Sequence, residues 1–143
     1  YRARSEKEIR DRLRKKGFGS STADEVLDSL LKSGLVNDQE FARAFANDKL
    51  LKKPMGRVML KQELRRKGIT KETIEQVLSE AYGSEDEDQY AFELATKRIK
   101  LSQFSFARLD PLKQRKRLSD YLARRGFNWE TVAKAVERVL GEV

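Results

Sequence analysis

The stretch MLKQELRRKGITKETIEQVL, residues 59–78, contains a pattern that occurs three times along the chain. Its core reads LKQELRRKGI at 60–69, and related versions read IRDRLRKKGF at 9–18 and LSDYLARRGF at 118–127. The glycines of the three versions, Gly17, Gly68 and Gly126, are 51 and 58 residues apart (68 − 17 and 126 − 68). This spacing is consistent with a unit of three helices, so we predict a helical repeat protein.

The three versions align without a gap through two helices joined by the glycine. Before the glycine the matching apolar residues are Leu13, Leu64 and Leu122, and after it they are Phe18, Ile69 and Phe127. Further apolar matches recur at spacings of three and four, which places one apolar stripe on each helix. We therefore predict three helical hairpins, each with a left-handed glycine at its turn.

A single helix is predicted between successive hairpins. Asn37 begins one at about 37–52, and a capping box of Ser84 with Glu87 begins another, with Tyr90 and Leu94 on its apolar side. The total is eight helices and no strand. The predicted fold class is all-α: an elongated array of three tandem three-helix units at 1–36, 37–83 and 84–143. The first unit lacks most of its first helix, which we expect to precede Tyr1.

Composition points to a binding protein. Of the 143 residues 38% are charged, and 31 Lys and Arg outnumber 23 Asp and Glu to give a net charge of +8, which favours an acidic or polyanionic partner. The chain has no cysteine and no histidine, which excludes disulfides, imidazole bases and the ordinary zinc sites. No membrane-spanning run or signal peptide is evident. We expect a cytoplasmic, non-enzymatic monomer without cofactor or metal.

The basic residues concentrate on the first helix of each hairpin. Residues 54–70 carry five cations and one anion, whereas residues 71–89 carry one cation and seven anions. Like charges four residues apart repel each other on a helix, so helix stability does not explain the row Arg57, Lys61 and Arg65. We predict that this row binds a partner, and we add the corresponding outer rows and the cations before the glycines as candidates: Arg10, Arg14, Lys113, Arg117, Arg66, Lys67, Arg124 and Arg125. The cations before the glycines have an alternative, structural explanation, because the helix dipole favours positive charge in the last turn of a helix.

Three motifs, in this order and spacing, resemble the RecX family of regulators of the RecA recombinase: RSEKEIRDRL at 4–13, LVNDQEFARAF at 35–45 and LKQELRRKGI at 60–69. The resemblance covers nearly the whole chain. It implies a protein of three three-helix units that binds the RecA filament on single-stranded DNA. It also implies that binding inhibits the recombinase, ATPase and coprotease activities of the filament.

Two alternative functions follow from the residues alone. Two short helices joined by a glycine turn could form a DNA-reading helix-turn-helix, but the second helices carry Glu72, Glu75 and Glu130, the wrong sign for a phosphate-lined groove. Direct, non-specific binding of single- or double-stranded DNA by the first helices stays open. Phe104 and Phe106 are expected to hold their loop against the core rather than to stack on bases, and Trp129 is expected to be a packing anchor.

Overall fold

The computed structural model describes residues 4–141, except the side chain of Phe104. These residues contain only helices as regular structure, which confirms the all-α prediction. The helices are α1 Glu6–Lys15, α2 Ser20–Lys32, α3 Asp38–Lys52, α4 Arg57–Arg66, α5 Lys71–Ala81, α6 Asp86–Leu101, α7 Gln103–Ala107, α8 Pro111–Arg124 and α9 Trp129–Leu140. The described residues thus hold one more helix than the sequence predicted, because the loop before Asp110 forms the short helix α7.

Most helices begin where a polar side chain can cap them. The Asn37 side chain accepts hydrogen bonds from the amides of Gln39 and Glu40, and Asp110 accepts one from Lys113 ahead of Pro111. The predicted capping box at Ser84 is wrong. There Asp86 accepts a hydrogen bond of 2.9 Å from the Gly83 amide, and α6 begins after Glu85 without a side-chain cap. This bond lies in the turn before the helix, so the first amides of α6 have no side-chain cap.

The three hairpin turns have the same backbone conformation. Gly17, Gly68 and Gly126 have φ angles of +89°, +82° and +90°, as predicted. In each turn the amide of the next residue donates to the carbonyl of the matching leucine five positions earlier, at 3.1, 3.2 and 3.3 Å. This bond closes the helix end in the manner of a Schellman motif. The repeat seen in the sequence is therefore also a repeat of backbone geometry.

The second and third units each contain a buried apolar cluster. The first cluster joins α3, α4 and α5 around Phe41 and Leu64, and the second joins α6, α8 and α9 around Leu94 and Leu122. The hairpin α1–α2 belongs to neither cluster, and α1 has no buried residue. Phe18 is accordingly 47% exposed, although its counterpart Ile69 is 5% exposed.

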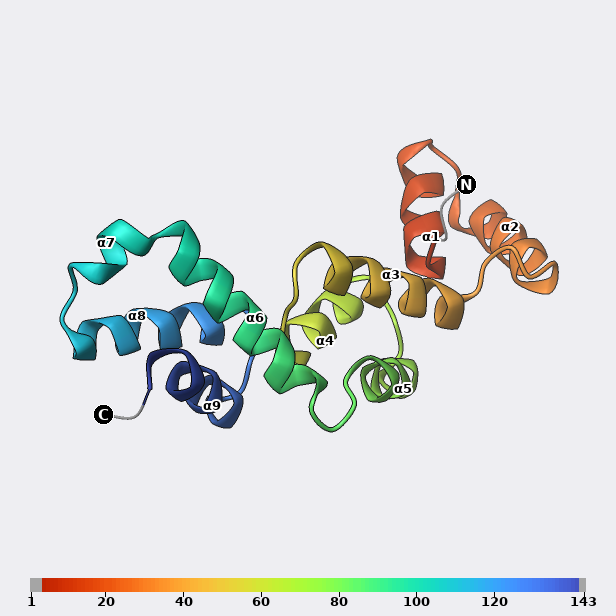
Figure 1. Ribbon diagram of the computed structural model, residues 1–143. Helices are drawn as coiled ribbons and strands as arrows, with labels where there is room; N and C mark the ends of the chain where they lie inside the picture. The colour runs from red at the N-terminus through yellow and green to blue at the C-terminus, as the bar shows by residue number, and fades with distance from the viewer. Residues whose placement is uncertain (1–3, 142–143) are drawn as a thin grey trace.

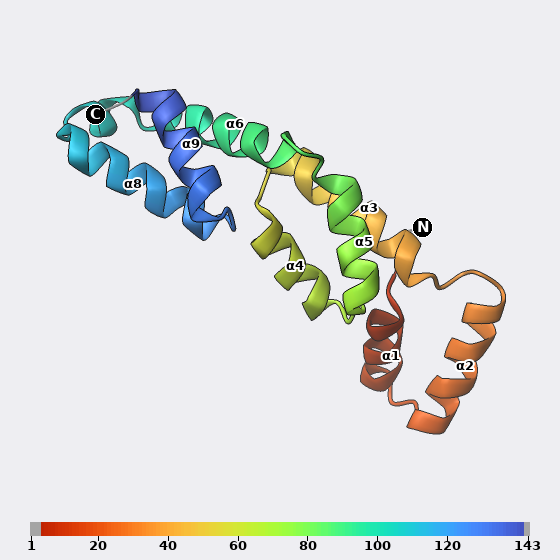
Figure 2. The same cartoon turned by 90° about the horizontal axis from the view of Figure 1, so that it is seen from below.

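The units follow one another in an elongated array, as predicted. Figure 1 shows the hairpin α1–α2 at one end, the unit of α6, α8 and α9 at the other, and α3, α4 and α5 between them. From below, α8, α4 and α1 follow one another along one long edge (Figure 2). Among the described residues, no helix is long and apolar enough to cross a membrane.

Backbone atoms join the second unit to the third. The Gly56 amide donates to the Arg125 carbonyl at 2.8 Å, and the Val58 amide donates to the Gly126 carbonyl at 3.2 Å. Within the second unit, the Tyr82 hydroxyl donates to the carbonyl of Met55, next to Gly56, at 2.7 Å, and burial raises the pKa of this hydroxyl. The turn of the third unit is thus fixed to the start of α4.

The first and second units meet in a related way. The Ser5 hydroxyl donates to the Lys67 carbonyl at 3.0 Å, and the Lys7 ammonium donates to the Arg66 carbonyl at 2.7 Å. The two junctions share one arrangement. Carbonyls at the end of α8 accept hydrogen bonds from residues at the start of α4, and carbonyls at the end of α4 accept them from residues at the start of α1. At the junction of the first and second units side chains donate to these carbonyls, whereas at the junction of the second and third units backbone amides donate to them.

Candidate functional site

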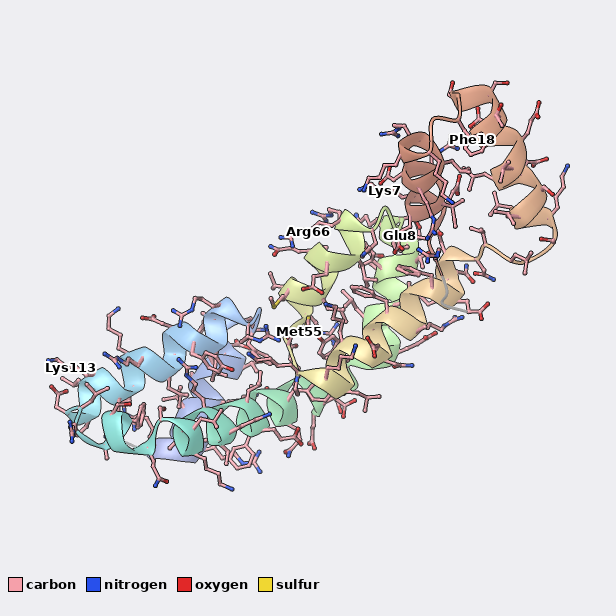
Figure 3. The ribbon with its side chains drawn as sticks, turned by 90° about the horizontal axis from the view of Figure 1, so that it is seen from above. Lys7, Glu8, Phe18, Met55, Arg66 and Lys113 are labelled. Carbon is pink, nitrogen blue, oxygen red and sulfur yellow. The ribbon has the colours of Figure 1, made fainter. Side chains whose placement is uncertain are left out.

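The candidate site is the long edge formed by the first helix of each hairpin. We call it the basic edge and define it by the cationic side chains of α1, α4 and α8. Figure 3 labels one residue from each of these helices, Lys7, Arg66 and Lys113, and all three lie along this edge. The helices are held in line by the unit junctions, so cations that are far apart in sequence share one side of the molecule.

Arg57 makes contacts that hold helices together, although helix stability alone did not explain its row. Its guanidinium pairs with Glu87 at 3.3 Å, donates to the Tyr82 carbonyl at 3.0 Å and lies 5.3 Å from the centre of the Tyr82 ring. The sequence pattern missed this because Glu87 is 30 residues away, whereas the repulsion argument considered neighbours on one helix. Arg57 therefore links α4 to the start of α6.

The rest of the central row differs from Arg57. Arg65 and Arg66 are exposed, and Lys61 is half-buried. No carboxylate of the described residues forms an ion pair with these three side chains. Lys67 is occupied, because it pairs with Glu8 at 3.5 Å and its ammonium lies 5.8 Å from the centre of the Phe45 ring.

The cations of α8 also divide into free and occupied groups. Lys113, Arg117 and Arg124 are exposed and have no ion-pair partner among the described residues. Arg125, in contrast, donates to the Pro54 carbonyl at 3.1 Å and fixes the linker before α4. This contact between the third unit and the linker gives Arg125 a structural role that requires no partner molecule.

The two candidate cations of α1, Arg10 and Arg14, are paired with nearby carboxylates. Arg10 pairs with Asp24 at 2.5 Å and with Glu6 at 3.9 Å, and the hydrogen bond to Asp24 raises the pKa of Arg10. Arg14 pairs with Asp11 at 3.6 Å. These exposed pairs are weak, but they reduce the excess charge at this end. Of the candidate cations predicted from the sequence, those of α1 are thus paired, whereas Arg65, Arg66, Lys113, Arg117 and Arg124 are not.

Two hollows open beside the basic edge and contain residues that sequence reasoning missed. One of about 710 Å³ lies between α3 and α4, and Phe45, Lys49, Arg66 and Lys67 are among its lining residues. The Lys49 ammonium lies 5.4 Å from the centre of the Phe45 ring. Phe45 is an apolar residue of the helix predicted at 37–52, and only the tertiary placement of α4 shows that part of its side chain faces a cationic hollow.

The second hollow, of about 380 Å³, lies between α6, α7 and α8. Arg117 and Arg124 of the basic edge line it together with Arg98 of α6, whose guanidinium lies 4.7 Å from the centre of the Tyr121 ring. Phe106 is buried beside it at 9% exposure, which confirms its predicted packing role, whereas the side chain of Phe104 lies outside the described part.

Trp129 does not pack into the core. It is 77% exposed, so the prediction of a packing anchor is wrong. The buried stripe of α9 passes through Thr131, Val132, Ala135 and Val136. Trp129 lies roughly 90° around the helix from the middle of that stripe, given about 100° per residue. The described residues contain no group of three or more acidic side chains arranged to hold a metal ion.

Comparison with protein families agrees with this architecture unit by unit. The first three-helix domain of RecX matches residues 1–30, the second matches 37–78 and the third matches 85–136. The chain belongs to the RecX family. A regulatory protein RecX from Amycolatopsis mediterranei is 38% identical over 126 residues, covering 88% of this chain and 69% of the relative. Another RecX, from Chlorobium phaeobacteroides, is 31% identical and covers 96% and 85%.

Solved structures of RecX proteins have the same fold. The crystal structure of RecX from Lactobacillus salivarius superposes with a TM-score of 0.82 at 19% identity, covering 97% of this chain and 87% of that chain. A second RecX crystal structure gives a TM-score of 0.83 at 20% identity. The helical array of this RecX-family chain is therefore shared with relatives that are only 19–20% identical to it.

Proposed function

We propose that this chain regulates the RecA recombinase by docking its basic edge on the RecA filament on single-stranded DNA. Docking inhibits ATP hydrolysis by the filament together with its recombinase and coprotease activities. Family membership supports the regulatory role, since the matched relatives are named regulatory proteins RecX. The observation that carries the proposed face is the set of exposed, unpaired cations on α4 and α8: Arg65, Arg66, Lys113, Arg117 and Arg124.

The physical argument rests on unpaired charge. A cation in an exposed ion pair is already partly neutralised, and it contributes little to the attraction of a distant partner. Arg65 and Arg117 retain their full charge on helices that the unit junctions hold in line. A filament that exposes protein carboxylates and DNA phosphates is strongly negative, so such an edge accelerates encounter and orients docking. We expect this contact to weaken as the salt concentration rises.

A second function, direct and non-specific binding of nucleic acid, is favoured by one observation. In the hollow between α3 and α4, Phe45 lies next to the ammonium groups of Lys49 and Lys67. Aromatic rings beside cations are how single-strand binding proteins hold bases and phosphates. This function predicts that Phe45→Ala weakens binding to free oligothymidine, whereas filament regulation predicts that Arg65 and Arg117 matter most on the assembled filament.

The test of the proposed function uses two double variants with the same change in net charge. Arg65→Glu with Arg117→Glu reverses two unpaired cations of the basic edge. Lys71→Glu with Lys100→Glu is the control, because both lysines are exposed, lie outside the basic edge and have no ion-pair partner among the described residues. Lys100, like Arg65, lies in the last turn of its helix, so these two reversals have a similar helix-dipole cost, whereas Lys71 begins α5, where a glutamate is favoured.

Each protein is titrated into a RecA filament on single-stranded DNA while ATP hydrolysis is followed. The edge variant is expected to need at least about tenfold more protein for half inhibition, which corresponds to about 1.4 kcal/mol. The control is expected to inhibit like the wild type, and both should melt within a few degrees of it. If both variants inhibit equally well, the assignment of the basic edge is wrong. If the wild-type chain leaves hydrolysis unchanged, the proposed inhibition is wrong.

A further inference from the structure

A third hollow, of about 590 Å³, lies between the second and third units, and the proposed function makes no use of it. We call it the central hollow. It is lined by the end of α3, the linker at Lys53 and Pro54, one side of α6 and Tyr121 of α8. Figure 3 shows the region around Met55 where the end of α3, the linker and α6 come together.

The central hollow is bordered by the two most exposed leucines among the described residues. Leu51 of α3 is 86% exposed and Leu101 of α6 is 77% exposed, and both line the hollow. Single exposed leucines are common on protein surfaces. Here two leucines from different helices flank one hollow, and the buried Leu50 and Leu94 form part of its wall. Such a grouping is typical of a protein interaction surface.

The charge around the central hollow is positive. Lys52, Lys53, Lys97 and Arg98 line it, and Glu93 is the acidic residue among its lining residues. Lys52 is the one partly neutralised lysine, by an exposed pair with Asp48 at 3.1 Å. The hollow therefore complements a segment that combines apolar side chains with carboxylates.

The aromatic residues of the hollow favour a protein segment over a nucleic acid. Bases stack on exposed aromatic rings, whereas the most exposed apolar side chains of this hollow are leucines. The guanidinium of Arg98 covers a face of Tyr121 at 4.7 Å, and Tyr90 packs edge-on against the buried Tyr82, with ring centres 5.8 Å apart and planes at 85°. The exposed leucines instead suit the apolar stripe of an amphipathic helix lying in a groove.

The wall of the hollow is anchored before any partner arrives. Arg125 donates to the Pro54 carbonyl at 3.1 Å, Tyr82 donates to the Met55 carbonyl at 2.7 Å, and the Gly56 amide donates to the Arg125 carbonyl at 2.8 Å. The linker is thus fixed on both sides of the unit junction. A preorganised surface loses little conformational freedom on binding.

We propose that the central hollow docks an acidic amphipathic segment of a partner protein. The apolar side chains of this segment lie between Leu51 and Leu101, and its carboxylates meet Lys53, Lys97 and Arg98. The inference goes beyond the proposed function, because none of these residues belongs to the basic edge and the docked segment is not required to come from the recombinase.

The test measures fluorescence anisotropy of a labelled synthetic helix of about 14 residues, four turns long, with leucines along one face and glutamates elsewhere. A second peptide replaces the leucines by serines at the same net charge. The protein variant Leu51→Ser with Leu101→Ser removes the apolar border. Leu35→Ser with Leu112→Ser is the control, because these leucines are also exposed, at 58% and 72%, and lie outside the hollow.

The leucine peptide is expected to bind the wild-type chain with a Kd of about 10–100 µM. The Leu51→Ser, Leu101→Ser variant is expected to bind it at least about fivefold more weakly, and the control variant is expected to bind it normally. Both sites are exposed, so circular dichroism melting should show folded proteins. Three results would each overturn the proposal: no binding to the wild type, equal binding of the serine peptide, or a hollow variant that weakens binding of labelled oligothymidine instead.

Discussion

Gly126 has two roles, and only one of them is visible in the sequence. Its φ of +90° is the left-handed conformation that the repeat predicts for a glycine at a hairpin turn. Its second role is close packing, because a Cβ added at Gly126 would lie 2.4 Å from the Met59 Cβ and 2.5 Å from the Met59 amide nitrogen. Gly17 has nearly the same φ, but a Cβ there would meet nothing within 4 Å.

This difference makes a matched pair of substitutions informative. Gly17→Ala introduces backbone strain alone, and we expect it to lower the free energy of unfolding by about 1–2 kcal/mol. Gly126→Ala adds a clash with the backbone of α4, and we expect a loss of about 3 kcal/mol or more. Urea denaturation followed by circular dichroism measures both values. Equal losses would show that the turn of the third unit does not pack closely against α4 in solution.

Individual site residues were less predictable than the glycine turns. The sequence identified the concentration of cations on α4 and α8, because charge counts require no tertiary information. It could not separate Arg65, which is unpaired, from Arg57, which pairs with Glu87 at 3.3 Å, because that partner lies on another helix. Leu51 and Leu101 lie off the apolar stripes of their helices, and this displacement was the one signal in the sequence that could have indicated the central hollow.

At the scale of helices, spacing rules predicted existence and approximate bounds well. The apolar stripes at spacings of three and four gave eight of the nine helices in the described part, and polar caps fixed several of their starts. The short α7 was missed because QFSFA has too few residues to show a helical period. What spacing cannot give is the degree of burial, since Leu13 matches Leu64 and Leu122 in sequence but is only half-buried.

The unequal burial predicts unequal local stability. The hairpin α1–α2 lies outside both apolar clusters, and its buried apolar residues are Ala23 and Leu27 of α2. Local opening requires little free energy where few apolar contacts are lost. We expect the amides of α1 and α2 to exchange with solvent at least about tenfold faster than those of α4 and α9 in native-state hydrogen exchange. Uniform protection across the three hairpins would contradict this.

At the scale of the whole molecule, the array departs from a compact shape. Each unit contacts its neighbours in the chain, and the first and third units lie at opposite ends (Figure 1). A compact chain of 143 residues would have a radius of gyration of about 14–15 Å. We expect small-angle X-ray scattering to give a clearly larger radius at low protein concentration. A value within the compact range would mean that the units fold back on one another in solution.

The main-chain hydrogen bonds between the second and third units affect which surface residues can be substituted without changing how the units are placed. The amides of Gly56 and Val58 donate to the carbonyls of Arg125 and Gly126, so these contacts between the units do not depend on which side chains the surface carries. The spacing of these two units is therefore expected to stay the same when surface residues are substituted. Substitutions among the unpaired cations Arg65, Arg66, Lys113, Arg117 and Arg124 can strengthen or weaken the binding of a partner without altering the spacing of the units. For a partner built from regularly spaced subunits, the spacing of the units would still match the spacing of its subunits after many surface substitutions.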